Sequence, residues 1–202
     1  MTFDSSALAW GKNDNGLLPA VIQDVNTGQV LMLGYMNAQA LQQTQSTGFV
    51  TFFSRSKKRI WKKGETSGNT LRFISVSCDC DGDSLLIRAI PMGPTCHSGK
   101  QSCFNTAETA LETLGNLIET IRRRAKSGSQ NSYTKRLLDG GINVYGAKVL
   151  EEAEELVRAA GQEGRQRTIE EASDLLYHTL VLFQGEKISI ENIAQELRRR
   201  RR

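Results

Sequence analysis

The hydrophobic periodicity of this 202-residue chain changes once, near residue 104, and the change divides the sequence into two halves. Between residues 17 and 92, apolar residues form short runs rich in β-branched and aromatic side chains, which glycines interrupt. These runs predict strands at residues 20–25, 30–34, 49–54, 71–77 and 84–90. Residues 26–28, Asn-Thr-Gly, predict a hairpin turn, and Asn37 predicts the cap of a helix over residues 37–46. We therefore expect an α+β N-terminal domain with a small mixed or antiparallel sheet.

After Cys103 the apolar residues recur at helical intervals, and no strand pattern follows before the chain ends. The first such series is Leu111, Leu114, Ile118, Ile121 and Ala125. We therefore expect an all-α C-terminal domain. The boundary is placed between a first domain at residues 1–106 and a second at residues 107–202.

Composition narrows the class of protein. An apolar content of 39% is compatible with ordinary globular cores. The first residues lack the basic and apolar regions of a secretion signal, and no apolar run reaches membrane-spanning length. Four cysteines in a chain of this size fit reduced thiols better than a disulfide framework. We expect a cytoplasmic protein without a membrane partner.

The net charge of +4 depends on the last five residues, 198–202, which are all arginine. Without them the net charge would be −1. Such a tail can bind nucleic acid or an acidic partner, or it can be the solvated end of a helix, stabilised by the helix dipole. We favour the helix end, and we expect no nucleic-acid partner.

Residues 79–83, Asp-Cys-Asp-Gly-Asp, combine two kinds of metal ligand, three carboxylates and one thiol. Carboxylates suit Mg²⁺ or Ca²⁺, whereas thiolates suit Zn²⁺, so this segment predicts two metals. In an extended chain Asp79, Asp81 and Asp83 would share one face and Cys80 would lie on the other. A calcium-binding helix-loop-helix is excluded, because Ser84 and Ile90 stand where it needs glycine and glutamate. A solvated acidic turn remains an alternative.

Cys80, Cys96 and Cys103 form the candidate thiolate set, although their spacing is not that of a zinc finger. Together with His97 they could close a structural zinc site; with water in the fourth position the site would be catalytic. A hydrogen-bonded loop histidine is the alternative interpretation of His97. Cys78 is the spare cysteine, and it can be a small buried apolar residue.

Two predicted helices in the second half each carry paired carboxylates. Lys148, Glu152 and Glu155 share one stripe at helical spacing, at the rim of an apolar face. Glu171, Asp174 and His178 share a stripe on the next helix. If the helices pack antiparallel, the four carboxylates could converge on one Mg²⁺. The alternatives are a solvated acidic face, or a helix-capping role for Glu171 with Thr168.

Several stretches together resemble the bifunctional enzyme of histidine biosynthesis, in which phosphoribosyl-AMP cyclohydrolase is fused to phosphoribosyl-ATP pyrophosphohydrolase. In the first half these are LMLGYMN (31–37), TFFSRSKKRIWKKGETSGN (51–69), DCDGDSLL (79–86) and GPTCHSGKQSCF (93–104). In the second half they are SYTKRLL (132–138), KVLEEAEE (148–155) and EASDLLYHTLVL (171–182). The resemblance covers nearly the whole chain, in the family's domain order.

The resemblance implies a homodimer in which Cys80 of one subunit completes a zinc site with Cys96 and Cys103 of the other. It implies that Asp79, Asp81 and Asp83 hold Mg²⁺. For the second half it implies a helical nucleotide pyrophosphohydrolase fold, in which Glu152, Glu155, Glu171 and Asp174 bind a catalytic Mg²⁺.

The implied chemistry is two successive hydrolyses. The C-terminal domain would cleave phosphoribosyl-ATP to phosphoribosyl-AMP and pyrophosphate, with Lys148 as a candidate phosphate contact. The N-terminal domain would then open the purine ring between N1 and C6 with a zinc-activated water, and His97 would move the proton. The candidate substrate-binding residues of this domain lie on a polar, glycine-bearing loop and are Arg55, Ser56, Lys63, Glu65, Thr66, Ser67 and Asn69.

Two other functions compete with this interpretation. A general nucleotide pyrophosphohydrolase with a zinc-stapled, non-catalytic N-terminal domain would release pyrophosphate from ordinary nucleoside triphosphates and open no ring. A binding module with structural zinc would show salt-dependent affinity for nucleic acid and no turnover.

Overall fold

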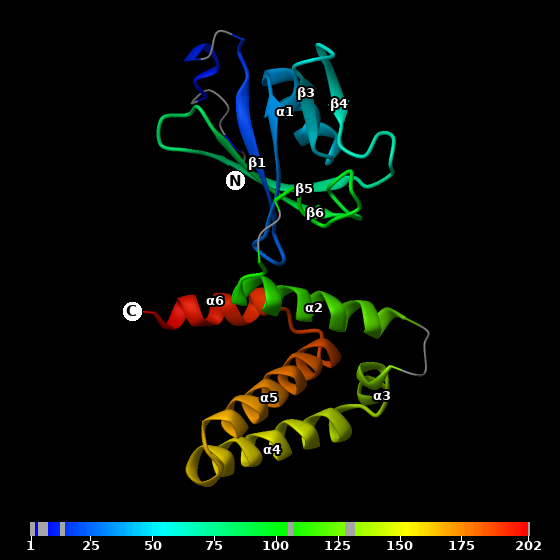
Figure 1. Cartoon of the computed structure of the whole chain (residues 1–202), viewed down its shortest axis with the longest axis vertical. Helices are drawn as coiled ribbons and strands as arrows, with labels where there is room; N and C mark the ends of the chain where they lie inside the picture. Colours follow the sequence, from blue (N-terminus) through cyan, green and yellow to red (C-terminus); the bar gives the residue numbers. More distant parts are fainter. Residues whose placement is uncertain (1–2, 4–7, 13–14, 105–106, 128–131, 202) are drawn as a thin grey trace. The chain divides into compact units, whose positions relative to one another are not determined.

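The computed structural model describes residues 3, 8–12, 15–104, 107–127 and 132–201. Its contacts define two compact units, Met1–Gly115 and Asn116–Arg202, and each is described by itself (Figure 1). Residues 105 and 106, at the boundary expected from the sequence, lie outside the described residues, and that boundary stays a prediction.

The first unit is built on a mixed four-stranded sheet in the order β2-β1-β6-β5. Strand β1 (Leu18–Asp24) pairs antiparallel with β2 (Val30–Met36) and parallel with β6 (Leu85–Pro91), and β5 (Leu71–Cys78) pairs antiparallel with β6. Strands β3 (Thr51–Ser54) and β4 (Arg59–Lys62) form a separate antiparallel pair. The helix α1 (Ala38–Thr47) contacts both β2 and β3. A short 3-10 turn, η2, covers Trp10–Lys12. The expected α+β class is confirmed.

Local sequence signals explain how these elements begin and end. Gly28, at the hairpin between β1 and β2, has a positive φ of 76°, and its N–H donates to the Asp24 carbonyl at 2.9 Å. Asn37 caps α1, because its side chain accepts a hydrogen bond from the Ala40 N–H at 2.8 Å. The predicted hairpin and the predicted cap are both confirmed.

The core of this unit lies where the alternating residues of β1 meet α1 and β3. Leu18, Ala20 and Ile22 are fully buried, as the two-residue period of a half-exposed strand requires. Phe52 of β3 is also fully buried, and its ring lies 5.2 Å from that of Trp61 on β4. Strand β4 is absent from the sequence prediction, because Arg59 and Lys62 enclose only two apolar residues.

The second unit is helical. It contains the end of α2 (Ala110–Lys126), then α3 (Tyr133–Asp139), α4 (Ile142–Arg158), a π-helical turn η3 (Ala159–Glu163), α5 (Arg165–Gly185) and α6 (Ile190–Arg200). Helices α4 and α5 are packed side by side and joined by the η3 turn, so they run antiparallel (Figure 1). The core draws on four helices, and its buried members are Ile121, Leu137, Tyr145, Leu180 and Val181.

The arginine-rich end of the chain is helical, as expected. Arg198, Arg199 and Arg200 occupy the last turn of α6 and pair with Glu191 or Glu196 of the same helix. Arg202 lies outside the described residues. None of the helices in the described part of the chain has the length and apolar character needed to cross a bilayer.

We predict that Phe52→Ala lowers the free energy of unfolding of the first unit by about 3–5 kcal/mol, because it leaves a cavity beside Trp61. Urea denaturation followed by tryptophan fluorescence measures the change. Phe104→Ala is the matched control; Phe104 is 46% exposed, and we expect a cost of about 0.5 kcal/mol or less. Equal costs for the two variants would contradict the placement of Phe52 in the core.

Candidate active sites

A cavity of about 660 Å³ opens in the first unit and gathers most of the predicted N-terminal site residues. Its walls come from β2, from β3 and β4, from the loop after β4, and from the loop after β6. The predicted residues that line it are Lys63, Glu65, Thr66, Ser67, Asn69, Cys96, His97 and Cys103. Residues distant in sequence thus form one pocket, as a binding site for a small ligand requires.

Two predicted substrate contacts lie elsewhere. The Arg55 guanidinium stacks 3.9 Å from the centre of the Tyr35 ring, and both residues line a neighbouring hollow of about 380 Å³ that Asp83 also borders. Ser56 lines neither hollow, and its hydroxyl lies 3.4 Å from that of Ser54. Tyr35 borders both hollows and therefore lies between them.

In the loop after β4, Gly64 and Gly93 lie so close to Asn69 that a side chain at either glycine would overlap it. Gly64 has a φ of 83°, and a Cβ there would lie 2.5 Å from the Asn69 backbone. A Cβ at Gly93 would lie 2.4 Å from the Asn69 side-chain oxygen. The Lys63 ammonium is buried in the same loop and donates to the Asn69 carbonyl at 3.4 Å. Glycine at these positions lets residues 63–69 fold tightly against the cavity.

Lys63 and Glu65 differ in their electrostatic surroundings. Burial lowers the pKa of Lys63, an effect that the nearby Cys103 and Cys96 oppose. Arg59 forms a two-pronged contact with Glu65, which lowers the pKa of that carboxyl and raises that of the guanidinium. Arg59, Tyr35 and Trp61 are cavity residues that the sequence analysis missed. Arg59 and Trp61 belong to the KKRIW run at residues 57–61, and Tyr35 belongs to the LMLGYMN stretch at residues 31–37; these two stretches were the available signals.

Cys96 and Cys103 lie together in the cavity, with His97 beside them. The Ser98 hydroxyl donates to Cys96 Sγ at 3.1 Å and lowers the pKa of that thiol. Burial and the neighbouring Cys96 raise the pKa of Cys103. The Cys103 N–H donates to the Leu31 carbonyl at 2.7 Å, which fixes this end of the loop to β2. Cys96 Sγ lies 3.8 Å from His97 Nδ1.

Cys80 does not join these thiols within one chain. Among the described residues, no set containing Cys80, Cys96 and Cys103 has its ligand atoms within 4.8 Å of one another. Cys80 is exposed, on the turn that follows β5. Cys78 ends β5 and packs half-buried against the core, in agreement with a structural role.

The three aspartates do converge, but not by the geometry expected. Residues 79–84 form a turn, not an extended strand: Gly82 has a φ of 73°, and Asp79 Oδ1 accepts from the N–H groups of Asp83 and Ser84 at 3.0 and 3.1 Å. The alternation argument for this segment was therefore wrong, because the carboxylate of Asp79 folds the chain back on itself. Carboxylate oxygens of Asp79, Asp81 and Asp83 lie within 4.8 Å of one another. The Lys12 ammonium contacts Asp81 and lies 3.0 Å from Asp83.

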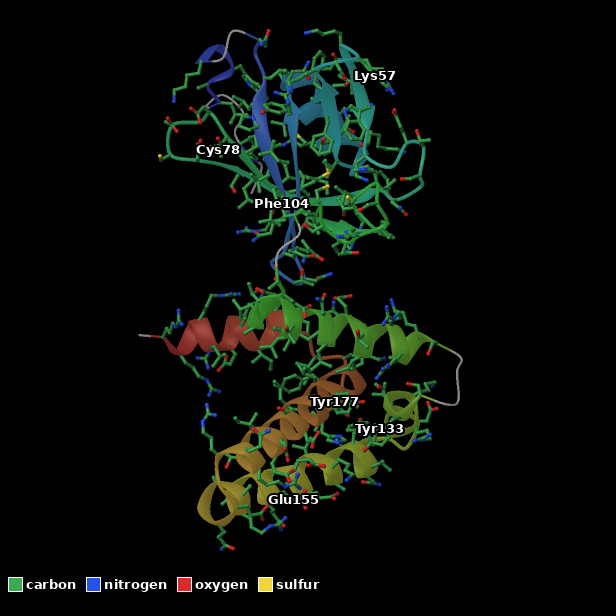
Figure 2. The ribbon with its side chains drawn as sticks, in the orientation of Figure 1. Lys57, Cys78, Phe104, Tyr133, Glu155 and Tyr177 are labelled. Carbon is green, nitrogen blue, oxygen red and sulfur yellow. The ribbon has the colours of Figure 1, made fainter. Side chains whose placement is uncertain are left out.

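In the second unit, Glu152 and Glu155 of α4 meet Glu171 of α5, with carboxylate oxygens within 4.8 Å of one another. Figure 2 shows Glu155 on α4 and Tyr177 on the facing helix. Glu171 is only 2% exposed and Glu152 only 7%, so both lie deeper than the rim position expected. Burial raises the pKa of Glu171, and the charges of Glu155, Glu152 and Asp174 raise it further against the opposing effect of Arg167.

Asp174, the fourth predicted carboxylate, is exposed and lies outside this group of three. The capping role for Thr168 and Glu171 is wrong, because α5 begins at Arg165 and the Thr168 hydroxyl donates to the Gly164 carbonyl at 2.9 Å. Arg167 contacts Glu171, and Lys148 lies 3.6 Å from Glu152. Both buried glutamates thus have a basic neighbour, and Oε1 of Glu171 has no hydrogen-bond partner among the described residues.

Comparisons with known proteins agree with these two groups of residues. The phosphoribosyl-AMP cyclohydrolase family matches residues 32–105, and the phosphoribosyl-ATP pyrophosphohydrolase family matches residues 114–201. The histidine biosynthesis bifunctional protein HisIE of Shewanella oneidensis is 48% identical over 194 residues, which cover 96% of this chain and 91% of that protein. The chain belongs to this bifunctional family.

Other members of the bifunctional family are similarly close. The HisIE proteins of Salmonella typhimurium and of Escherichia coli K12 are 46% and 45% identical over 193 residues, which cover 96% of this chain and 95% of each relative. The resemblance drawn from the motifs is confirmed. The cyclohydrolase match contains the cavity and the three aspartates, and the pyrophosphohydrolase match contains the three glutamates.

We predict that Gly64→Ala lowers the free energy of unfolding by about 2–4 kcal/mol, since an alanine there is strained by its φ and also overlaps the Asn69 backbone. Gly68→Ala is the matched control, because its φ of 77° is similar but its Cβ would meet open space. We expect the control to cost about 1 kcal/mol in the same chemical denaturation. If both variants lose the same stability, the close approach to Asn69 is not a constraint.

Proposed function

We propose that the chain catalyses two successive hydrolyses in histidine biosynthesis, one in each half. The C-terminal half cleaves phosphoribosyl-ATP to phosphoribosyl-AMP and pyrophosphate, and the N-terminal half opens the purine ring of phosphoribosyl-AMP between N1 and C6. The observation that carries this proposal is that each family match contains its own converged set of metal-suited side chains.

Glu152, Glu155 and Glu171 have the donors that Mg²⁺ prefers. Two of these carboxylates are buried, and burial together with the neighbouring negative charges raises the pKa of Glu171, so a cation among them would relieve an unfavourable arrangement. When bound, Mg²⁺ neutralises phosphate charge and polarises water. Asp174, exposed near this group, is proposed to complete the carboxylate set. Lys148 is the candidate phosphate contact, because its ammonium already lies at the edge of the cluster.

The N-terminal cavity has room and chemistry for a phosphoribosyl nucleotide. We assign the phosphate to the loop of Lys63, Thr66, Ser67 and Asn69, where a buried ammonium, two hydroxyls and an amide face the cavity. The paired Arg59 and Glu65 stiffen this wall by their two-pronged contact. Arg55 and Ser56 do not line this cavity, and we assign them no role in binding the phosphate there.

Cys96 and Cys103 fit a zinc ion as two adjacent soft donors, and the separate position of Cys80 supports the proposal that a second copy of the chain supplies the third. Zinc, when bound, lowers the pKa of a water molecule to about 7. We assign proton transfer during ring opening to His97, and its position beside Cys96 supports this assignment. Asp79, Asp81 and Asp83 are proposed to hold Mg²⁺, with Lys12 as the competing cation.

We predict that Glu171→Gln lowers pyrophosphate release from phosphoribosyl-ATP by about 100-fold or more, because the carboxylate cluster loses a ligand. Glu170→Gln, at the neighbouring exposed carboxylate, should stay within about twofold of the wild-type rate. Pyrophosphate release is followed with a coupled assay at saturating Mg²⁺. Ring opening of supplied phosphoribosyl-AMP should be unchanged in both variants. A wild-type rate in Glu171→Gln would overturn the assignment of this cluster.

We predict that Cys103→Ala accumulates phosphoribosyl-AMP, because pyrophosphate release continues while ring opening is lost. Cys78→Ala is the control cysteine variant and should turn over both substrates. Product analysis by chromatography, together with the zinc content of each variant, measures the outcome. Ring opening by Cys103→Ala at the wild-type rate would refute a catalytic zinc. Release of pyrophosphate from ATP as fast as from phosphoribosyl-ATP, without any ring opening, would favour the general pyrophosphohydrolase.

Mixing two inactive variants tests whether Cys80 acts across a dimer. If Cys80 serves the partner's site, refolded mixtures of Cys80→Ala and Cys103→Ala contain heterodimers with one intact zinc site. In a two-fold symmetric dimer with random pairing, ring opening should recover to about a quarter of the wild-type rate. No recovery in mixtures that contain heterodimers, measured with differently tagged chains, would place all three cysteines in one subunit.

A further inference from the structure

His178 is a buried histidine beside the carboxylate cluster that the proposed chemistry does not use. It lies on α5, seven residues and therefore about two helical turns after Glu171, on the same face of the helix. The residue has a relative exposure of only 4%, and its side chain one of 6%. A buried imidazole is costly unless its two nitrogens have suitable surroundings.

The two ring nitrogens of His178 differ sharply. Nε2 lies 3.7 Å from the Glu152 Oε1 atom. Nδ1 is buried and has no hydrogen-bond partner within the described part of the chain. Only one nitrogen therefore has a polar neighbour that can fix the ring.

Aromatic rings fix the plane of the imidazole. Tyr177 packs edge-on against it, with ring centroids 5.1 Å apart and an angle of 76°, and Tyr133 does so at 6.0 Å and 85°. The Tyr177 hydroxyl lies 2.8 Å from that of Thr134, so its hydrogen bond is made elsewhere. The ring of His178 is thus held by packing, and rotation about its side-chain bonds is restricted.

The neighbours of His178 select one tautomer. Burial lowers its pKa, and the positive charge of Lys148 lowers it further, although Asp174 and Glu151 oppose this. A neutral imidazole has one donor and one acceptor, whereas the Glu152 carboxylate only accepts. If the proton is on Nε2, the N–H group faces the Glu152 carboxylate and attracts it. If the proton is on Nδ1, the Nε2 lone pair faces that carboxylate and repels it. The tautomer with the proton on Nε2 is therefore favoured.

The separation of 3.7 Å is about 0.7 Å longer than an ordinary N–H···O bond, and such contacts are often long in an enzyme without its substrate. Lys148 lies 3.6 Å from the same Glu152 oxygen. Glu152 Oε1 thus has two neighbours that can donate, Lys148 and His178. An N–H donor held by aromatic packing would keep this carboxylate in one orientation toward Glu155 and Glu171.

We propose that His178 is a positioning residue of the pyrophosphohydrolase site, whose Nε2–H group orients the Glu152 carboxylate for binding of the divalent cation. This inference rests on the proposed function of the cluster. Hydrogen-bond partners of metal-binding carboxylates commonly change metal affinity or activity by about 10–100-fold when they are removed. His178 contributes in this way without touching the substrate.

The test compares two amides that differ in where they place a donor. In His178→Gln the amide nitrogen reaches about as far as Nε2, whereas in His178→Asn it is shorter and corresponds to Nδ1. Mn²⁺ binding to the full chain, without substrate, is followed by the electron paramagnetic resonance signal of the free ion. The amount of Mn²⁺ bound by Glu171→Gln is subtracted from that bound by each other protein. The difference reports the glutamate cluster alone, because sites in the N-terminal half contribute equally to both values.

We expect His178→Asn to weaken Mn²⁺ binding at this site by about tenfold or more, and His178→Gln to remain within about threefold of wild type. The Mg²⁺ concentration for half-maximal pyrophosphate release should rise in parallel. Thermal unfolding of each variant shows whether the second unit still folds. The asparagine and glutamine variants both remove the aromatic ring, so a loss of packing alone would affect the two similarly.

The outcomes separate the inference from the function on which it rests. Wild-type Mn²⁺ affinity in both variants overturns the positioning role, and so does an equal loss in both, because the retained donor would then have no effect. Equal binding by wild type and Glu171→Gln would instead show that the glutamate cluster binds no such cation. That result would overturn both the metal assignment and the role of His178.

Discussion

Repulsion among three carboxylates is the interaction on which the helical half of this protein depends. Glu152, Glu155 and Glu171 come within 4.8 Å of one another, and two of them are buried. Burial raises the pKa of Glu171, and the like charges of Glu155, Glu152 and Asp174 raise it further by destabilising the ionised form. Helices α4 and α5 also carry basic side chains that form ion pairs with these glutamates; they are Lys148, Arg158 and Arg167. The packing of the two helices therefore holds an arrangement that a cation would stabilise.

In the N-terminal half, the cavity forms because loops that are distant in sequence lie close together in the fold. The backbone of β2 anchors the cysteine loop through the bond from Cys103 to Leu31, and the Ser102 hydroxyl donates to the Val30 carbonyl at 2.8 Å. On the other wall, Gly64 and Gly93 allow Asn69 to approach without side-chain overlap. The cavity thus depends on backbone contacts that side-chain chemistry alone would not suggest.

The features that sequence predicted well are local. The hairpin at Gly28 and the cap at Asn37 need only a few neighbouring residues, and the change to helical spacing after Cys103 is visible over many turns. The features it missed depend on distant partners. Strand β4 exists because it pairs with β3, and Arg59 borders the cavity because it binds Glu65. The carboxylates of residues 79–83 meet through a turn closed by Asp79, which a two-residue alternation could not represent.

Two buried acidic residues, Asp24 and Glu171, differ in whether their carboxylates have hydrogen-bond partners, and this difference indicates which of them has a structural role. Asp24 is buried and its pKa is raised by burial, but it accepts a hydrogen bond from the Asn26 N–H at 2.9 Å, and Thr27 also contributes. It closes the hairpin after β1 and so has a complete structural role. Glu171 is more deeply buried, faces two other carboxylates, and has Arg167 as its one opposite charge among the residues that the structure describes. A carboxylate buried among like charges costs stability, so the position of Glu171 beside Glu152 and His178 fits a site that is completed by a ligand.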